Sequence, residues 1–265
     1  MTVTPEELNL ALNSLWLNDK RVLAHASLRG VGPIEGGAEA LLSVLLSTTG
    51  GLMMPAFTYR TMVTPASGPP NNGMTYGSDR DQNLMAEPFD ARMPVDPLMG
   101  VLAETLRQHP TAKRTQHPIL SFTGSRCDDE LMTQTMEEPL APIGALADED
   151  GWVLLIGVDQ TANTAIHYGE RLAGRRAFVR WALTKERIVE CPGFPGDSTG
   201  FRSIAPDLEE FSRVAQVGEA RVQAMPLKKL LEKVTARLRR NSLALLCNRP
   251  DCERCRAIEA AHDAG

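Results

Sequence analysis

The strongest constraint on the fold is the stretch 152–174, which predicts a buried strand, a turn and the start of a helix in succession. The apolar run 152–156 is long enough for a buried strand and far too short to cross a membrane. Gly157 ends the run, and Asn163 or Thr164 is suited to cap a helix that begins there. In α/β enzymes, catalytic groups often lie where a strand ends and a helix starts.

The predicted helix carries two residues suited to proton transfer. His167 and Glu170 are three positions apart, so both lie on one face of the helix. An imidazole with an ordinary pKa of about 6.5 exchanges protons at neutral pH, and a carboxylate beside it can fix its tautomer. Spacing alone also fits a solvated ion pair or a helix-stabilising contact, which is the commoner arrangement.

A glycine-rich loop follows another predicted strand. Residues 21–27 read as that strand, residues 27–37 as the loop, and residues 38–46 as a helix. Free N–H groups at such a helix start favour an anion such as a phosphate. The loop matches neither a P-loop nor a clean dinucleotide-binding motif, so a structural turn is equally compatible. His25, at the end of the strand, is a second candidate imidazole or a buried structural histidine.

About forty residues after the predicted strand 51–58 are rich in turn formers and show little periodicity, as in functional or disordered loops. Acidic residues in this segment suit a cationic ligand, although a solvated surface loop is the alternative. The remaining pattern predicts helices at 99–108, 208–217 and 227–239, and strands at 176–183, 187–191 and 242–247. No repeat or linker divides the chain, so we expect a single α/β domain over residues 1–265.

Composition excludes some function classes. The 265 residues carry a net charge of -5, whereas nucleic-acid-binding proteins are usually basic. A modest acidic balance suits a small cationic substrate. No apolar run approaches the length of a membrane-spanning helix, and the first residues lack the pattern of a signal peptide. We therefore expect a cytoplasmic protein with no membrane or nucleic-acid partner.

Three of the five cysteines cluster near the C-terminus. Cys247, Cys252 and Cys255 have the spacing C-x4-C-x2-C, and His262 follows seven residues later. Three thiolates and an imidazole can form a zinc site. A second C-x-x-C pair is missing, so free thiols or a redox-labile pair are the alternatives.

Seven sequence pieces, in order, resemble the aminoglycoside 3-N-acetyltransferase family over residues 20 to 175. The pieces are H-A-S-L with G-x-G-x-x-x-G-G (25–37), M-P-A-F-T-Y (54–59), P-F-D (88–90), M-G-x-L-A-E-T-L-R (99–107), H-P-x-x-S-F (117–122), P-I-G-A-L (142–146), and L-x-G-V followed by N-T-x-x-H-x-x-E (155–170). The resemblance implies a three-layer α/β/α fold with a central mixed sheet, unlike the GCN5-type acetyltransferase fold. It also implies acetyl-CoA-dependent N-acetylation of the 3-amino group of 2-deoxystreptamine aminoglycosides, an antibiotic-resistance activity that needs no metal.

The resemblance also implies roles for single residues. His167 would be the general base, Glu170 its orienting carboxylate, and His25 would lie near the thioester. The residues expected to bind coenzyme A are Ser27, Leu28, Gly32, Glu35, Gly36, Arg114, Thr115 and Ser121. The residues expected to bind the cationic amine are Tyr59, Asp79, Glu87, Asp90 and Glu104. Backbone N–H groups after Ser27 would hold the developing oxyanion.

Other readings remain open. Thr115 stands where the family often has serine, and the segment between Tyr59 and Glu87 lacks the tryptophans common in resistance enzymes. The natural acceptor is therefore either an aminoglycoside or another small amine. A metal-dependent hydrolase would use imidazole and carboxylate ligands, here His25, His117, His167 and Glu170. A protein that only sequesters cationic antibiotics through its acidic loop is the third reading.

Overall fold

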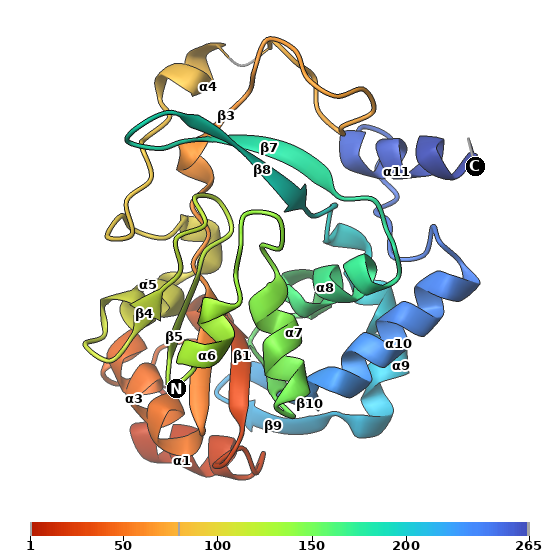
Figure 1. The fold of residues 1–265 in the computed structure, drawn as a ribbon. Coiled ribbons are helices and arrows are strands. Elements are labelled where there is room, and N and C mark those ends of the chain that lie inside the picture. Colours follow the sequence, from red (N-terminus) through yellow and green to blue (C-terminus); the bar gives the residue numbers. More distant parts are fainter. Residues whose placement is uncertain (1, 79, 264–265) are drawn as a thin grey trace.

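A seven-stranded mixed sheet between two layers of helices forms the centre of the computed structural model, which describes residues 2–78 and 80–263 (Figure 1). The strand order is β4-β5-β2-β1-β6-β10-β9. The strands are β1 (Arg21–Ala26), β2 (Gly51–Pro55), β4 (Lys113–Arg114), β5 (Phe122–Ser125), β6 (Trp152–Ile156), β9 (Arg213–Val217) and β10 (Ala220–Pro226). β1 runs parallel to β2 and β6, whereas β5 and β10 pair antiparallel with their neighbours. The predicted α/β/α fold with a mixed sheet is confirmed.

Alternating side chains of the two central strands build the layers. Leu23 and Leu155 pack into one hydrophobic cluster, and Ala24 and Leu154 pack into the other on the opposite face. Successive side chains of a strand point to opposite faces, so a sheet buried on both sides needs continuous apolar runs. His25 therefore shares the face of Leu23, two residues earlier.

The helices cover both faces of this sheet. The first group, in contact with one another, is α1 (Pro5–Asn13), α3 (Gly37–Thr48) and α5 (Val101–Gln108). The second group, on the other face, is α7 (Ala141–Asp148), α8 (Ala165–Leu172) and α10 (Leu227–Arg240). The short helices are α2 (Leu28–Val31), α4 (Arg80–Leu84), α6 (Asp128–Met132) and α9 (Ala205–Leu208), and α11 (Glu253–Asp263) follows near the C-terminus. No helix in the described part of the chain is long and apolar enough to span a membrane.

A second, three-stranded antiparallel sheet lies apart from the first. It consists of β3 (Met62–Val63), β7 (Phe178–Leu183) and β8 (Ile188–Phe194), in the order β3-β7-β8. In Figure 1, β7 and β8 cross the upper part of the view, and α11 lies beside them. The strands predicted at 176–183 and 187–191 are confirmed, but their place in a separate sheet was not predicted.

Two predicted elements near the C-terminus are wrong. Residues 213–217 of the predicted helix 208–217 form strand β9, because β10 supplies hydrogen-bonding partners that the local pattern does not reveal. Residues 242–247 form turns rather than a strand, and Leu245 there has a φ of 67°. Leu245 and Cys247 are nevertheless buried, so the apolar run packs on the core without joining a sheet.

Candidate active site

The site forms where β1 and β6 end side by side. Ala26 pairs with Ile156 in parallel register, and the N–H of Ser27 donates to the carbonyl of Ile156 at 2.9 Å. The loops that follow cross closely, since a Cβ on Gly30 would lie 2.5 Å from the carbonyl oxygen of Gly157. Gly157 itself has a φ of 64°, in the left-handed region that favours glycine. This crossing brings the chain after β6 against the end of β1.

Helix α8 begins at this edge with Thr164 as its N-cap, whose side chain makes no capping bond; the preceding Asn163 side chain does instead. The Asn163 side-chain oxygen accepts a hydrogen bond from the N–H of Ala165 at 3.2 Å, which confirms the predicted helix start. The Asn163 amide also donates to the Gln160 side chain at 2.8 Å. The N–H of Thr164 donates to Nε2 of His25 at 3.4 Å, joining the helix start to β1. The cap therefore fixes the direction of α8 relative to the sheet.

The first turns of α8 hold a histidine and a glutamate that are hydrogen-bonded to each other, and an arginine just after the helix pairs with the glutamate. Nδ1 of His167 lies 2.7 Å from Oε2 of Glu170, and Oε1 of Glu170 accepts from Nη1 of Arg175 at 2.5 Å. The Glu170 and Arg175 side chains are only 6% and 4% exposed. The Arg175 guanidinium also donates to the carbonyls of Ser242 and Ala244. A buried carboxylate paired in this way is held in one orientation.

This arrangement sets the tautomer of His167. A carboxylate accepts but cannot donate, so the neutral ring carries its proton on Nδ1 and presents a lone pair on Nε2. The ring of Phe201 packs edge-on at 4.6 Å between centroids and fixes the imidazole plane. Sequence analysis missed Arg175, which directly follows the helix-ending Gly174 and folds back so that its N–H donates to the Glu170 carbonyl at 2.9 Å.

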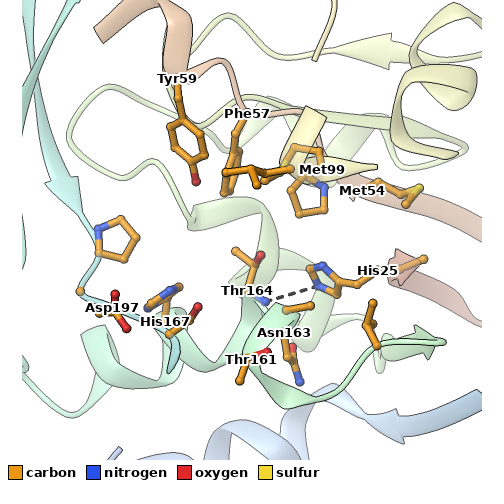
Figure 2. Close-up of a pocket in the computed structure, with 18 of the residues that line it drawn as sticks. His25, Met54, Phe57, Tyr59, Met99, Thr161, Asn163, Thr164, His167 and Asp197 are labelled. Atoms are coloured by element: carbon orange, nitrogen blue, oxygen red, sulfur yellow. Dashed lines mark hydrogen bonds between the residues drawn. The ribbon is translucent and has the colours of Figure 1, made fainter. Parts of the chain in front are cut away.

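His167 faces a cavity of about 410 Å³, a size typical of small-molecule sites (Figure 2). We call two parts of its lining the catalytic wall, made of His25, Asn163, Thr164 and His167, and the outer wall, made of residues 194–198 and Arg254. The remaining lining is mostly apolar and includes Met54, Phe57, Tyr59 and Met99. Within the described chain, Asp197 and Arg254 are the lining residues with a carboxylate or a guanidinium.

The outer wall holds a small ion-pair network that sequence analysis missed. Oδ2 of Asp197 lies 2.9 Å from the Arg249 guanidinium and 3.3 Å from that of Arg254. Burial by itself raises the pKa of Asp197, but hydrogen bonds from Thr199 and the charges of the two arginines lower it overall. Asp197 is therefore ionised at neutral pH. No local motif marks this residue, because its partners come from the C-terminal segment.

His25 lines the cavity but differs from His167. Its side chain has no carboxylate partner, and its Nε2 accepts from Thr164. Burial lowers the pKa of His25 to about 3. A neutral imidazole with so low a pKa is a poor general base at neutral pH. The geometry supports a lining and positioning role near β1 rather than proton abstraction.

The glycine-rich loop lies behind the catalytic wall. Ser27, Leu28, Gly32, Glu35 and Gly36 are not among the residues that line the cavity. Backbone N–H groups of the loop donate internally, as those of residues 30 and 31 do to the Ser27 carbonyl. Residues 32 and 35 likewise donate to backbone carbonyls. These four N–H groups therefore already have backbone partners.

The cavity lining does not include Arg114, Thr115 or Ser121, whose side chains make hydrogen bonds inside the protein instead. The Arg114 guanidinium donates to the carbonyls of Ala56 and Met93 at 2.6 and 2.5 Å. It also donates to Oγ of Ser121 at 3.1 Å. Burial lowers the pKa of Arg114 to about 10, so the group keeps its charge at neutral pH. Thr115 pairs with the backbone of residue 122.

Of the residues expected to bind the amine, Tyr59 lines the cavity. Burial raises the pKa of Tyr59 to about 12, so its hydroxyl stays protonated. Glu87, Asp90 and Glu104 lie outside the lining, and each pairs with a basic side chain, in turn Arg60, Lys185 and Arg107. Asp79 lies outside the described residues.

The ligand set of a histidine-based metal centre is not assembled. Within residues 2–78 and 80–263, the one group of three or more potential ligands is formed by Cys247, Cys252 and Cys255. His117 is buried away from the cavity, and its Nδ1 accepts from the N–H groups of Ile119 and Leu120. The structure therefore gives no support to the hydrolase reading.

Comparison with known proteins gives consistent matches. The family model described as aminoglycoside 3-N-acetyltransferase matches residues 23–239. Aminoglycoside N(3)-acetyltransferase III of Serratia marcescens is 27% identical over 222 residues, which cover 72% of this chain and 80% of that protein. Aminoglycoside N(3)-acetyltransferase IV of a Salmonella species is 29% identical over 160 residues, covering 57% of this chain and 52% of the relative. The match thus spans about half the length of the Salmonella protein.

Solved structures share the fold. The apoenzyme of aminoglycoside acetyltransferase AAC(3)-IVa superposes with a TM-score of 0.80 at 24% identity, covering 98% of each chain. A histidine-to-alanine variant of that enzyme in complex with gentamicin has a TM-score of 0.78 at 25% identity, again covering 98% of each chain. The binary complex of AAC-IIIb with CoASH has a TM-score of 0.72 at 19% identity, covering 91% of this chain and 97% of the other.

Proposed function

Because the chain belongs to the aminoglycoside 3-N-acetyltransferase family, we propose that it transfers the acetyl group of acetyl-CoA to an amine of an aminoglycoside. The observation that carries the proposal is His167, oriented by Glu170 and Arg175 and open to the cavity. The relatives solved with gentamicin and with CoASH are consistent with an amine acceptor and a coenzyme A donor.

The proposed chemistry is direct transfer between the two bound substrates. An ammonium group has no lone pair, so Nε2 of His167 first takes a proton from it, and the free amine then attacks the thioester carbonyl. The C–N bond forms and the C–S bond breaks. The second proton that the nitrogen loses on becoming an amide goes to the departing thiolate of coenzyme A. Glu170 accepts a hydrogen bond from the Nδ1–H group of His167 and stabilises the imidazolium while it exists.

The outer wall is proposed to hold the cationic acceptor. Asp197 is the lining carboxylate in the described chain and is ionised, so it attracts an ammonium group. Tyr59 offers a protonated hydroxyl on another side of the same cavity (Figure 2). The coenzyme is proposed to place its thioester beside His25, which lines the cavity at the end of β1.

A second candidate is acetylation of another small amine, and one observation favours it. Aminoglycosides carry several ammonium groups, whereas the described lining offers one carboxylate, which two arginines already contact. An acceptor with a single ammonium group needs fewer carboxylates. The reaction at His167 would be the same.

Thiol release from acetyl-CoA by the purified protein tests both candidates. The panel contains gentamicin, sisomicin, neomycin and apramycin, together with simple mono- and diamines, and mass spectrometry identifies the acetylated product. Release that depends on an aminoglycoside supports the first candidate, and release with simple amines alone supports the second. Absence of release, combined with no thermal stabilisation by acetyl-CoA, would contradict the acetyltransferase function.

A further inference from the structure

We propose that Cys247, Cys252 and Cys255 bind a structural zinc ion that fixes the outer wall of the cavity. The three sulfur atoms all lie within 4.8 Å of one another, and those of Cys247 and Cys255 are 3.3 Å apart. Thiolates around a tetrahedral zinc with Zn–S bonds of about 2.3 Å are about 3.8 Å apart. The cluster therefore needs only small side-chain movements to take the ion.

The fold gathers these cysteines from two separate segments. Cys247 lies in the chain between α10 and α11, whereas Cys255 lies in the first turn of α11 and Cys252 just before it. A backbone hydrogen bond from the N–H of Cys252 to the carbonyl of Arg249 closes the turn between them. All three are buried, at 5%, 7% and 1% exposure, and form a small cluster of their own. This arrangement protects a metal from competing ligands.

Two other uses of the cysteines fit less well. A disulfide would join two of the sulfur atoms and leave the third buried without a partner, and all three cysteines are free in this structure. Reactive thiols are usually solvent-accessible, whereas these are buried. Three converging sulfur atoms match the thiolate ligands that zinc prefers.

His262 is not the fourth ligand that the sequence suggested. It is exposed on α11, and its Nδ1 lies 3.1 Å from Oγ of Ser242, apart from the sulfur cluster. Within the described residues, the group of potential ligands contains the three cysteines alone. Zinc with three thiolates has a net charge of -1, which the Arg249 guanidinium beside Cys247 and Cys252 offsets.

The proposed ion connects to the cavity through two arginines. Arg249 lies in the loop between Cys247 and Cys252, Arg254 lies in the first turn of α11 beside Cys255, and both contact Asp197. Arg254 also donates to the carbonyl of Gly196 in the outer wall at 3.0 Å. Because metal binding by thiolates is coupled to folding, loss of the ion should loosen this wall.

Metal analysis of the full-length chain, purified without a metal-binding tag, tests the site. We expect about one zinc ion per chain in the wild type and in Cys191→Ser, and about a tenfold loss in Cys255→Ser. Cys191 is the matched control, because it is buried in β8 outside the cluster. Cobalt added to the metal-free protein should give an intense thiolate-to-cobalt charge-transfer band that weakens in Cys255→Ser.

Wild-type measurements decide the matter if Cys255→Ser does not fold. A strong zinc chelator should lower the melting temperature of the wild type, and added zinc, but not magnesium, should restore it. Wild-type protein without zinc and without a cobalt band would overturn the proposal. A native disulfide among the three cysteines, detected by mass spectrometry of the non-reduced protein, would also overturn it.

Discussion

The catalytic wall and the outer wall of the cavity are built in different ways. The catalytic wall comes from the ends of two adjacent parallel strands and the helix that follows one of them. The outer wall joins the end of β8 to Arg254, far along the chain in the C-terminal segment. The comparison shows that a helix directly after a strand of the main sheet holds the group proposed to move protons, whereas contacts between segments distant in the sequence surround the charged side chains of the outer wall.

The histidines also differ from one another in their partners and their burial. His167 has a carboxylate on one ring nitrogen and the cavity on the other side. His25 and His117 are buried and have no carboxylate partner, and burial lowers their pKa values to about 3 and about 4. Among the histidines of the described chain, His167 alone combines a place on the cavity lining with a carboxylate partner.

The largest expected effect comes from the base of the catalytic wall. His167→Ala should lower kcat by about 10²–10⁴-fold, as expected when a general base is lost. Steady-state kinetics with the best acceptor of the panel measures the change. His25→Asn serves as the comparison and should lower kcat far less. Wild-type turnover in His167→Ala would remove this residue from the mechanism.

The next largest effect is expected on protein stability, when Arg175, the partner of Glu170, is replaced. Arg175→Met leaves the Glu170 carboxylate buried without its charge partner, so the free energy of unfolding should fall by about 3–5 kcal/mol. Urea denaturation measures the loss. Arg171→Met is the control, because the Arg171–Glu138 pair is partly exposed and should contribute less than about 1 kcal/mol. Equal losses in the two variants would show that the buried Glu170–Arg175 pair contributes no more to the free energy of unfolding than a partly exposed pair does.

A third prediction concerns the pH dependence of stability that the buried His117 causes. The unfolded chain binds a proton at His117 below about pH 6.5, but the folded chain does so only below about pH 4, so acid favours unfolding between these values. His117→Gln should therefore reduce the stability lost between pH 7 and pH 5 by about 2 kcal/mol. Urea denaturation at the two pH values checks this. The variant His262→Gln, changed at an exposed position, should lose as much stability between pH 7 and pH 5 as the wild type does.

The smallest effect tests the outer wall. Asp197→Asn should raise KM for the cationic acceptor about tenfold, a change of about 1.4 kcal/mol, with a smaller change in kcat. Glu87→Gln, outside the cavity, should change the same KM less than about twofold. If Glu87→Gln had the larger effect, the acceptor would bind along the acidic loop, as the sequence first suggested.

The strand and the helix that form the catalytic wall could be predicted because their sequence signals are local. The apolar run of β6, the capping residue Asn163 and the spacing of His167 and Glu170 all lie within one short stretch. The motif resemblance added the order of the elements and the class of reaction. These local patterns predict the elements correctly because the strand, the loop and the helix follow one another directly in the chain.

The outer wall could not be predicted in the same way. Asp197 acquires its role from Arg249 and Arg254, which only the tertiary fold brings close. Tertiary contacts also decide the surroundings of Arg114. This residue was expected to bind coenzyme A, but its guanidinium donates hydrogen bonds to the carbonyls of Ala56 and Met93. Strand β9 escaped prediction for a related reason, since its pairing with β10 overrides the helical pattern.

Calorimetric titration of His167→Ala with acetyl-CoA and with the acceptor tests the central claim most directly. A lost general base removes chemistry and leaves binding intact, so both dissociation constants should stay within about twofold of the wild-type values while transfer is lost. Binding of both substrates without transfer would support His167 as the group that takes the amine proton. Loss of acetyl-CoA or acceptor binding would instead show that His167 holds the cavity together, and would contradict its role as the base.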